Sequence, residues 1–177
     1  MRRKLLTILL SVLIVLSMMP LQSASAYTLE GYTWEDPTPV TYWWDTTITS
    51  ATSRACWQNG ASAWNNATSR VSFSYNSNYE VYLGATNDDN ISWDGITALY
   101  ASGNTITSAD CYLNEYYTNG YSSAKRQSVS THELGHVLGL GHSNGARIMN
   151  PYTDSRWDTY GVNTPQTDDL NGINAMY

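Results

Sequence analysis

All three histidines of this 177-residue chain lie within one short run, at His132, His136 and His142. The run reads H-E-x-x-H-x-x-G-x-x-H, with Glu133 after the first histidine and Gly139 between the last two. Imidazole nitrogens are common zinc ligands, and a catalytic zinc site has three protein ligands and an open position for water. The run therefore predicts one catalytic Zn²⁺ ion bound by the three histidines.

Helix geometry explains the spacing. Residues four apart on an α-helix differ by only about 40° around its axis, so His132 and His136 project side by side. Gly139 stands where the helix must end, because glycine tolerates the positive φ of a reversing turn, and that turn carries His142 to the metal. Glu133 is the predicted catalytic residue. It takes a proton from the zinc-bound water that attacks a peptide carbonyl and passes it to the leaving nitrogen.

The alternatives to a catalytic site are a chance motif on a surface helix and a structural metal site. A structural zinc normally has four protein ligands, and no fourth is evident near the histidines. The additional G-x-x-H at fixed spacing, in a chain with no other histidine, favours the catalytic interpretation.

The same run resembles the signature of the metzincin metalloproteases. Met149, in the sequence Ile-Met-Asn-Pro, is similar to their Met-turn, an apolar floor under the zinc histidines; the alternative is a generic core methionine. The short spacing and the Met-x-Pro form look most like the matrixins, the matrix-metalloprotease-like branch, here of a bacterial secreted type. The resemblance implies a zinc metalloendopeptidase.

The matrixin resemblance also implies a fold and a way of binding substrate. The expected fold is α+β, with a twisted mixed β-sheet of about five strands and three helices. Substrate would lie extended along an edge strand, for which residues 96–101 are the candidate. Pro151 and Tyr152 would line the pocket for the substrate side chain just after the scissile bond.

Residue periodicity assigns the elements that must position these groups. Alternating or β-rich segments predict strands at residues 40–44, 71–75, 80–84, 96–101 and 106–113. Helical spacing predicts a helix over residues 50–67 and a second that carries the first two histidines. The second helix begins after Ser122-Ser123, and either serine can cap it. A third helix is predicted to open with Thr164 as its capping residue and Pro165 at its first position.

The first 26 residues have the features of a secretory signal peptide. Three basic residues follow Met1, an apolar stretch covers residues 5–19, and a small-residue A-x-A site ends at Ala26. A membrane anchor is the alternative, but about 20 apolar residues are needed to span a bilayer. We expect residues 27–177 to form a single extracellular catalytic domain, with no membrane contact once the signal is removed.

Cys56 and Cys111 are the two cysteines of the chain. An even pair in an exported protein suggests a disulfide, here closing a loop of about 55 residues. The alternative is two buried free thiols. Neither cysteine is expected to bind the catalytic zinc, because three histidines already fill the protein positions.

The charge balance limits the classes of partner. The chain has 9 Lys and Arg against 15 Asp and Glu, for a formal net charge of −6. An acidic chain with no basic cluster beyond its first residues argues against nucleic acid and anionic membranes. Protein or peptide substrates remain the expected partners, and a monomer is the default expectation.

A polar loop offers a second, weaker metal site. Its side chains have oxygen atoms of the type that calcium binds, at Asn87, Asp88, Asp89, Asn90 and Asp94. They lack the D-x-D-x-D-G spacing, and such clusters also form solvated turns.

Two functional alternatives accompany the secreted endopeptidase. One is a narrow-specificity peptidase that acts on a single cell-wall or protein target. The other is a secreted metal-binding protein with no turnover, which would have no need of Glu133. Substitution of Glu133 therefore distinguishes an enzyme from a binding protein.

Overall fold

The computed structural model describes residues 27–177, so the predicted signal peptide lies outside the described residues. The elements in chain order are β1 (Thr28–Leu29), β2 (Val40–Trp44), α2 (Ala51–Ala67), β3 (Phe73–Tyr75), β4 (Val81–Thr86), β5 (Gly95–Ser102), β6 (Thr105–Asn114), α3 (Glu115–Thr118), α4 (Ser123–Val137), β7 (Leu140–Gly141), the π-helical turn η1 (Asp154–Thr159) and α5 (Thr167–Met176). No helix within residues 27–177 is long and apolar enough to cross a membrane.

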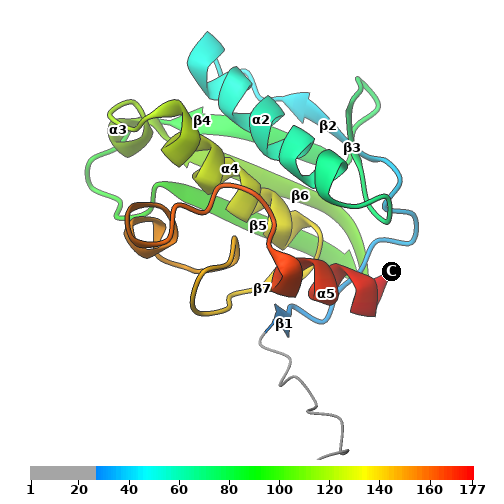
Figure 1. Cartoon of the computed structure of the whole chain (residues 1–177). Coiled ribbons are helices and arrows are strands. Elements are labelled where there is room, and N and C mark those ends of the chain that lie inside the picture. Colours follow the sequence, from blue (N-terminus) through cyan, green and yellow to red (C-terminus); the bar gives the residue numbers. More distant parts are fainter. Residues whose placement is uncertain (1–26) are drawn as a thin grey trace, which may run out of the picture.

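A five-stranded mixed sheet forms the centre, with strand order β3-β2-β4-β6-β5 (Figure 1). The pairs β3-β2, β2-β4 and β4-β6 are parallel, and the edge strand β5 pairs antiparallel with β6. A short ribbon of β1 and β7 lies apart from this sheet. The expected α+β class and five-stranded sheet are confirmed. The three predicted helices correspond to α2, α4 and α5, whereas α3 and η1 were not predicted.

The core lies between one face of the sheet and helices α2 and α4, which cover that face together (Figure 1). Along β6, buried Ala109, Cys111 and Leu113 alternate with half-buried Asp110 and Tyr112. This period of two is what a strand shows when one face packs on the core.

Two tryptophans fix α2 against its neighbours. The indole N–H of Trp57 donates to the carbonyl of Gly84 on β4 at 3.1 Å, and that of Trp64 donates to the carbonyl of Thr131 on α4 at 2.9 Å. Between them, Gly60 lets the helices approach closely, because a Cβ at this position would lie 2.7 Å from Ser130 Oγ. Helix α2 is thus fixed to the sheet through Trp57 and to α4 through Trp64.

Helix α5 begins later than the sequence predicted. Thr164 and Pro165 precede it, and Gln166 occupies the capping position. The backbone N–H of Gln166 donates to Asp169 Oδ2 at 2.7 Å, which completes a capping box. The prediction of Thr164 as the cap was wrong, because Gln166 is the N-cap residue and Asp169, inside the helix, accepts its N–H.

The predicted disulfide is absent, and Cys56 and Cys111 are buried free thiols. Cys56 Sγ donates to the carbonyl of Arg126 at 3.0 Å. Cys111 Sγ lies 3.5 Å from Thr97 Oγ1, and the nearby Glu133 carboxylate contributes, after burial, to raising the pKa of Cys111. Arg126 and Glu133 lie seven residues apart on α4, about 10 Å along the axis. The two sulfur atoms therefore face different parts of that helix.

Candidate functional site

Helix α4 and the turn after it bring the three histidines together. Ser122 caps the helix by accepting a hydrogen bond from the N–H of Lys125, which decides between the two serines, Ser122 and Ser123, that could cap it from the sequence. The helix ends at Val137, and Gly139 follows with φ +89°, the left-handed region expected of a reversing glycine. Any Cβ at Gly139 would also collide with the carbonyl oxygen of Tyr32.

The three histidine Nε2 atoms form a nearly equilateral triangle. His136 Nε2 lies 3.2 Å from that of His132 and 3.1 Å from that of His142, and the third side measures 3.3 Å. A tetrahedral zinc ion with Zn–N bonds of about 2.0–2.1 Å requires ligand separations of about 3.3 Å. Within residues 27–177, these histidines are the group of metal-ligating side chains arranged around one point.

Hydrogen bonds on the far side of two rings select the tautomer that a metal needs. His132 Nδ1 lies 2.8 Å from the carbonyl of Ile148, and His136 Nδ1 lies 2.8 Å from that of Leu140. Carbonyl oxygens only accept, so each Nδ1 carries the proton and each Nε2 turns a lone pair to the centre. Converging lone pairs repel one another unless a cation lies between them, so the residues present fit zinc.

Burial and neighbouring charges set the protonation of the histidines. Burial lowers the pKa of His132 well below its ordinary value, and it also lowers the pKa of His142. Burial acts in the same direction on His136, but the carboxylates of Glu30 and Glu133 outweigh it and raise the pKa of His136. Glu30 Oε1 lies 3.6 Å from His136 Nδ1. The segment after β1 thus places a carboxylate behind one histidine, a common arrangement at metal sites.

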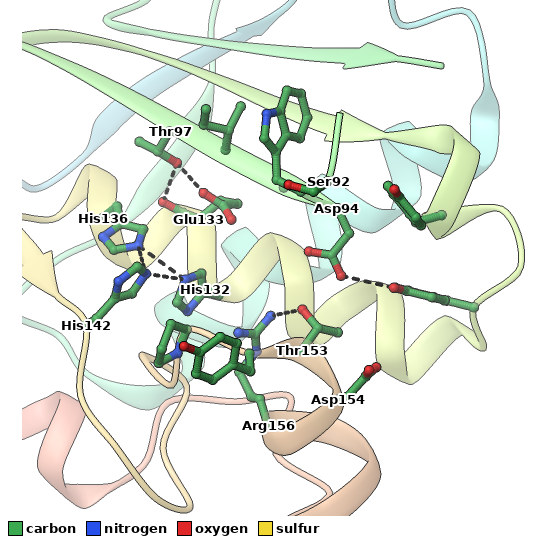
Figure 2. A pocket seen from close by; sticks show the side chains of 17 residues that line it. Ser92, Asp94, Thr97, His132, Glu133, His136, His142, Thr153, Asp154 and Arg156 are labelled. Carbon is green, nitrogen blue, oxygen red and sulfur yellow. Dashed lines mark hydrogen bonds between the residues drawn. The ribbon is translucent and has the colours of Figure 1, made fainter. Parts of the chain in front are cut away.

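Glu133 lies beside the histidines and is held from the edge strand (Figure 2). The hydroxyl of Thr97 on β5 lies 2.8 Å from Glu133 Oε2 and 3.1 Å from the Glu133 carbonyl oxygen. Gly95 makes room for the carboxylate, because a Cβ there would lie 2.6 Å from Glu133 Oε1. Burial raises the pKa of Glu133, which is 5% exposed.

Met149 lies directly beneath the histidine-bearing turn of α4. It is 1% exposed, and a Cβ at Gly135, between the two helical histidines, would overlap Met149 Sδ. The carbonyl of the preceding Ile148 is the partner of His132 Nδ1. Met149 therefore packs against the turn of α4 that carries His132 and His136, and its role as a Met-turn methionine stays a prediction from the matrixin resemblance.

A cavity of about 550 Å³ opens beside Glu133. Three segments form its walls: the segment that leads into β5, helix α4, and the segment from residue 151 to η1 (Figure 2). Pro151 and the 70% exposed Tyr152 line it, together with His132, Glu133, His136 and His142. The structure thus brings the predicted pocket residues and the predicted metal ligands into one cavity.

The loop that offered calcium ligands forms a turn. Asp88 Oδ1 accepts hydrogen bonds from the backbone and side-chain N–H groups of Asn90 at 2.8 and 3.0 Å. Asp94 lines the cavity instead, where Tyr121 donates to its Oδ2 at 3.2 Å. Calcium binding stays a prediction from the sequence, with no support from this geometry.

Comparison with known proteins decides the family, because the sequence profile described as Matrixin matches residues 33–177. The chain belongs to the matrixin family. Matrixins are zinc-dependent metalloendopeptidases, in agreement with the histidine triangle of this member. Metalloendoproteinase 1 of Glycine max is 50% identical over 52 residues. That match covers 29% of this matrixin but only 16% of the plant protein.

Several residues that shape this matrixin site were not predicted from the sequence. They are Thr97 and Gly95 on the edge strand, Asp169 on α5 and Arg156 in η1. Glycine at a strand end signals close approach of a neighbouring group, which could have drawn attention to Gly95. Threonine in a strand and arginine in a polar segment carry no such signal.

Proposed function

We propose that this matrixin is a secreted endopeptidase in which His132, His136 and His142 hold one zinc ion and Glu133 is the catalytic base. The observation that carries the proposal is the convergence of three Nε2 lone pairs at 3.1–3.3 Å, with a buried carboxylate on the adjacent residue in an open cavity. A structural role for the metal would not require an open cavity beside the ligands.

Glu133 carries the proton transfers in this proposal. A bound zinc ion supplies a water of lowered pKa and polarises the scissile carbonyl. Glu133 accepts the proton of the attacking water and delivers it to the departing amide nitrogen. The hydroxyl of Thr97 holds Oε2 of the carboxylate and leaves Oε1 for the proton transfers. The raised pKa of Glu133 suits both steps, because a group that must accept and then return a proton works best near the operating pH.

The edge strand β5 is the proposed platform for the substrate backbone. It borders the cavity through Gly95, Ile96 and Thr97, and it pairs with β6 on one side only. Its other edge leaves N–H and C=O groups for an added strand, and an extended peptide satisfies them along residues 96–101. Such main-chain pairing places a scissile bond against Glu133 whatever the side chains are.

The test is hydrolysis of casein by protein produced from the full chain, compared with Glu133→Ala purified identically. We expect cleavage by the first and none by the second, with one zinc per molecule in both. Cleavage that survives the substitution would remove Glu133 from the mechanism. No cleavage by either, with zinc bound and the fold intact, would favour the narrow-specificity peptidase or the metal-binding protein without turnover. Recovery of the protein from the medium, starting at Tyr27, tests the signal peptide.

A further inference from the structure

The sheet face opposite helices α2 and α4 is not used by the proposed reaction (Figure 1). Its aromatic side chains come from all five strands and from the loop before β4, and we call them the aromatic face: Trp43, Tyr75, Tyr79, Tyr82, Tyr100 and Tyr112. All six are half-buried or exposed. In β2, β4 and β6 these positions follow buried core residues, as expected for side chains that point away from the core.

The rings of the aromatic face are ordered by contacts with one another. Trp43 stacks on Tyr75, with ring centroids 4.5 Å apart and planes 10° apart. Tyr79 stacks on Tyr82 at 5.1 Å and 19°. Trp43 and Tyr82 are also register partners on adjacent strands, which lie about 4.8 Å apart. A ligand that crosses the strands therefore meets successive rings that are already restricted, and little affinity is lost to ordering them.

Carboxylates lie among these rings. Tyr112 covers Gly84 of the neighbouring strand, because a Cβ at Gly84 would lie 2.2 Å from Tyr112 Cε1, and its hydroxyl donates to Asp45 Oδ2 at 3.3 Å. The hydroxyl of Tyr100 donates to Asp110 Oδ2 at 3.1 Å. Within residues 27–177, neither carboxylate forms an ion pair inside 4 Å. An ionised carboxylate has about four acceptor sites, so Asp110 has lone pairs left for further donors.

The aromatic face has negative charge and no basic side chain. The sequence has no Lys or Arg in residues 27–53 or 71–124, which include all five strands of the sheet. Asp45, Glu80 and Asp110 lie in or next to these strands. This charge repels nucleic acids, acidic polysaccharides and anionic membranes. Two copies of the chain placed face to face would also bring like charges together, which disfavours a dimer through this surface.

We propose that the aromatic face binds an uncharged polysaccharide. A pyranose ring has a rim of hydroxyl groups and a flat surface of C–H groups on each side. The flat surface packs on aromatic rings, whose electron-rich faces attract C–H groups. The hydroxyl groups donate to carboxylates such as Asp110, which accept without needing a cation. The combination of stacked rings, hydrogen-bond acceptors and absent basic residues matches this class of ligand in both shape and charge.

A zwitterionic lipid surface is the main alternative, because tryptophan and tyrosine also favour the membrane interface. Lipid insertion requires aromatic side chains that project from the protein. Trp43 and Tyr82 are instead half-buried in ring stacks. The neighbouring Asp45 and Asp110 would lose water without gaining a donor from lipid tails, which is costly for charged groups. The polysaccharide therefore fits this surface better.

The proposed ligand leaves the candidate active site free. The histidines and Glu133 belong to α4 and the turn after it, on the other face of the sheet (Figure 1). Binding through the aromatic face requires neither zinc nor Glu133, so the inference does not depend on the proposed function. Taken together, the two describe a peptidase that is held on a polysaccharide while it cleaves protein.

The experiment measures depletion of Glu133→Ala protein, which cannot digest itself, from solution by microcrystalline cellulose and by chitin. We expect saturable binding to at least one, and Trp43→Ala should weaken it about tenfold, because an aromatic ring at the centre of a contact contributes strongly. Trp43→Tyr keeps a ring and should retain most of the affinity. Tyr160→Ala is the matched control, because it removes a 48% exposed tyrosine after η1, outside the aromatic face. No binding to either polysaccharide, or equal losses in Trp43→Ala and Tyr160→Ala, would overturn the proposal.

Tyr79→Ala separates lost binding from lost folding. Tyr79 lies in a loop and is 44% exposed, so its removal should leave Tm nearly unchanged while it weakens binding. Unchanged binding by Tyr79→Ala, together with a lowered Tm for Trp43→Ala, would show that Trp43 acts through folding, and the aromatic face would lose its assignment.

Sedimentation with phosphatidylcholine vesicles tests the lipid alternative. We expect the protein to stay in solution. Protein that sediments with the vesicles and not with the polysaccharides has a membrane-binding surface, and the proposal would be wrong. Polysaccharide binding by a protein whose unsubstituted form cleaves no casein would support this inference and count against the proposed peptidase alone.

Discussion

The backbone N–H of Met149 donates a hydrogen bond to Asp169 Oδ1 at 3.2 Å, which ties the turn beneath the histidines to the first turn of α5. Asp169 Oδ2 also accepts from the N–H of Ile148 at 3.0 Å and from that of Gln166 at 2.7 Å. The Ile148 carbonyl in turn bonds His132 Nδ1. One buried carboxylate therefore bonds the N–H of the α5 cap residue, holds the turn at Met149 and, through Ile148, orients the His132 ring.

Asp169→Asn should loosen this connection. An asparagine loses the charge and one acceptor oxygen, so at least one buried N–H is left without a partner. We expect the free energy of unfolding to fall by about 2–4 kcal/mol, as measured by urea denaturation. Zinc affinity should fall about tenfold in a chelator competition, because the groups behind a ligand contribute to its binding. Asp168→Asn is the control.

The neighbouring Asp168 pairs with Arg147 at 2.8 Å nearer the surface, and its removal should cost about 1 kcal/mol or less. Equal losses in stability and zinc affinity for the two variants would show that position on α5, and not the contact with Met149, sets the effect.

Thr97→Val should reduce catalysis without releasing the metal. The substitution keeps the shape of the side chain but removes the hydroxyl that holds Glu133 Oε2. We expect kcat/KM to fall about tenfold because Glu133 loses its fixed orientation, while zinc content measured by atomic absorption stays at one per molecule. Thr97→Ser restores the hydroxyl and should recover most of the rate. If the valine and serine variants lose activity equally, the hydroxyl is not what positions Glu133.

Gly135→Ala should destabilise the protein although alanine is the better helix former. The new methyl group would overlap Met149 Sδ and lie 3.2 Å from Trp64 Cζ2. Overpacking of this kind typically costs about 1–3 kcal/mol, against about 1 kcal/mol gained in helix propensity. The net loss should appear as a lower Tm. Adding Met149→Ala removes the overlap, so the double variant should be less destabilised than the sum of the two single changes.

Both cysteines should be slow to alkylate in the folded protein at pH 8. Burial raises the pKa of Cys56 to about 11 and raises that of Cys111 further. Only the thiolate reacts, and its fraction rises about tenfold per pH unit below the pKa. The rate at Cys56 with iodoacetamide should therefore increase steadily from pH 8 to pH 10, and both thiols should react rapidly in denaturant. An intact mass short of two hydrogen atoms, with no alkylation after unfolding, would instead establish the disulfide.

Features that depend on neighbours along the chain were accessible from the sequence. The His132 and His136 pair follows from helical periodicity, and Gly139 follows from the positive φ of a helix-ending turn. The need to cap the first N–H groups of α4 pointed to Ser122 or Ser123, of which Ser122 is the cap. The strands predicted at residues 40–44 and 106–113 likewise lie close to the observed β2 and β6. Each of these depends on interactions within a few residues, which the order of amino acids specifies directly.

Contacts between distant segments were decided by the tertiary structure. Cys56 and Cys111 were an open pair in the sequence, and the packing of α2 and β6 against different turns of α4 separated them. Thr97 reached Glu133, and Asp169 reached Met149, only because β5 and α5 pack beside the histidine helix. The physical reason is that such contacts depend on how whole elements pack their buried faces, and a change in one crossing angle or register replaces every partner at once.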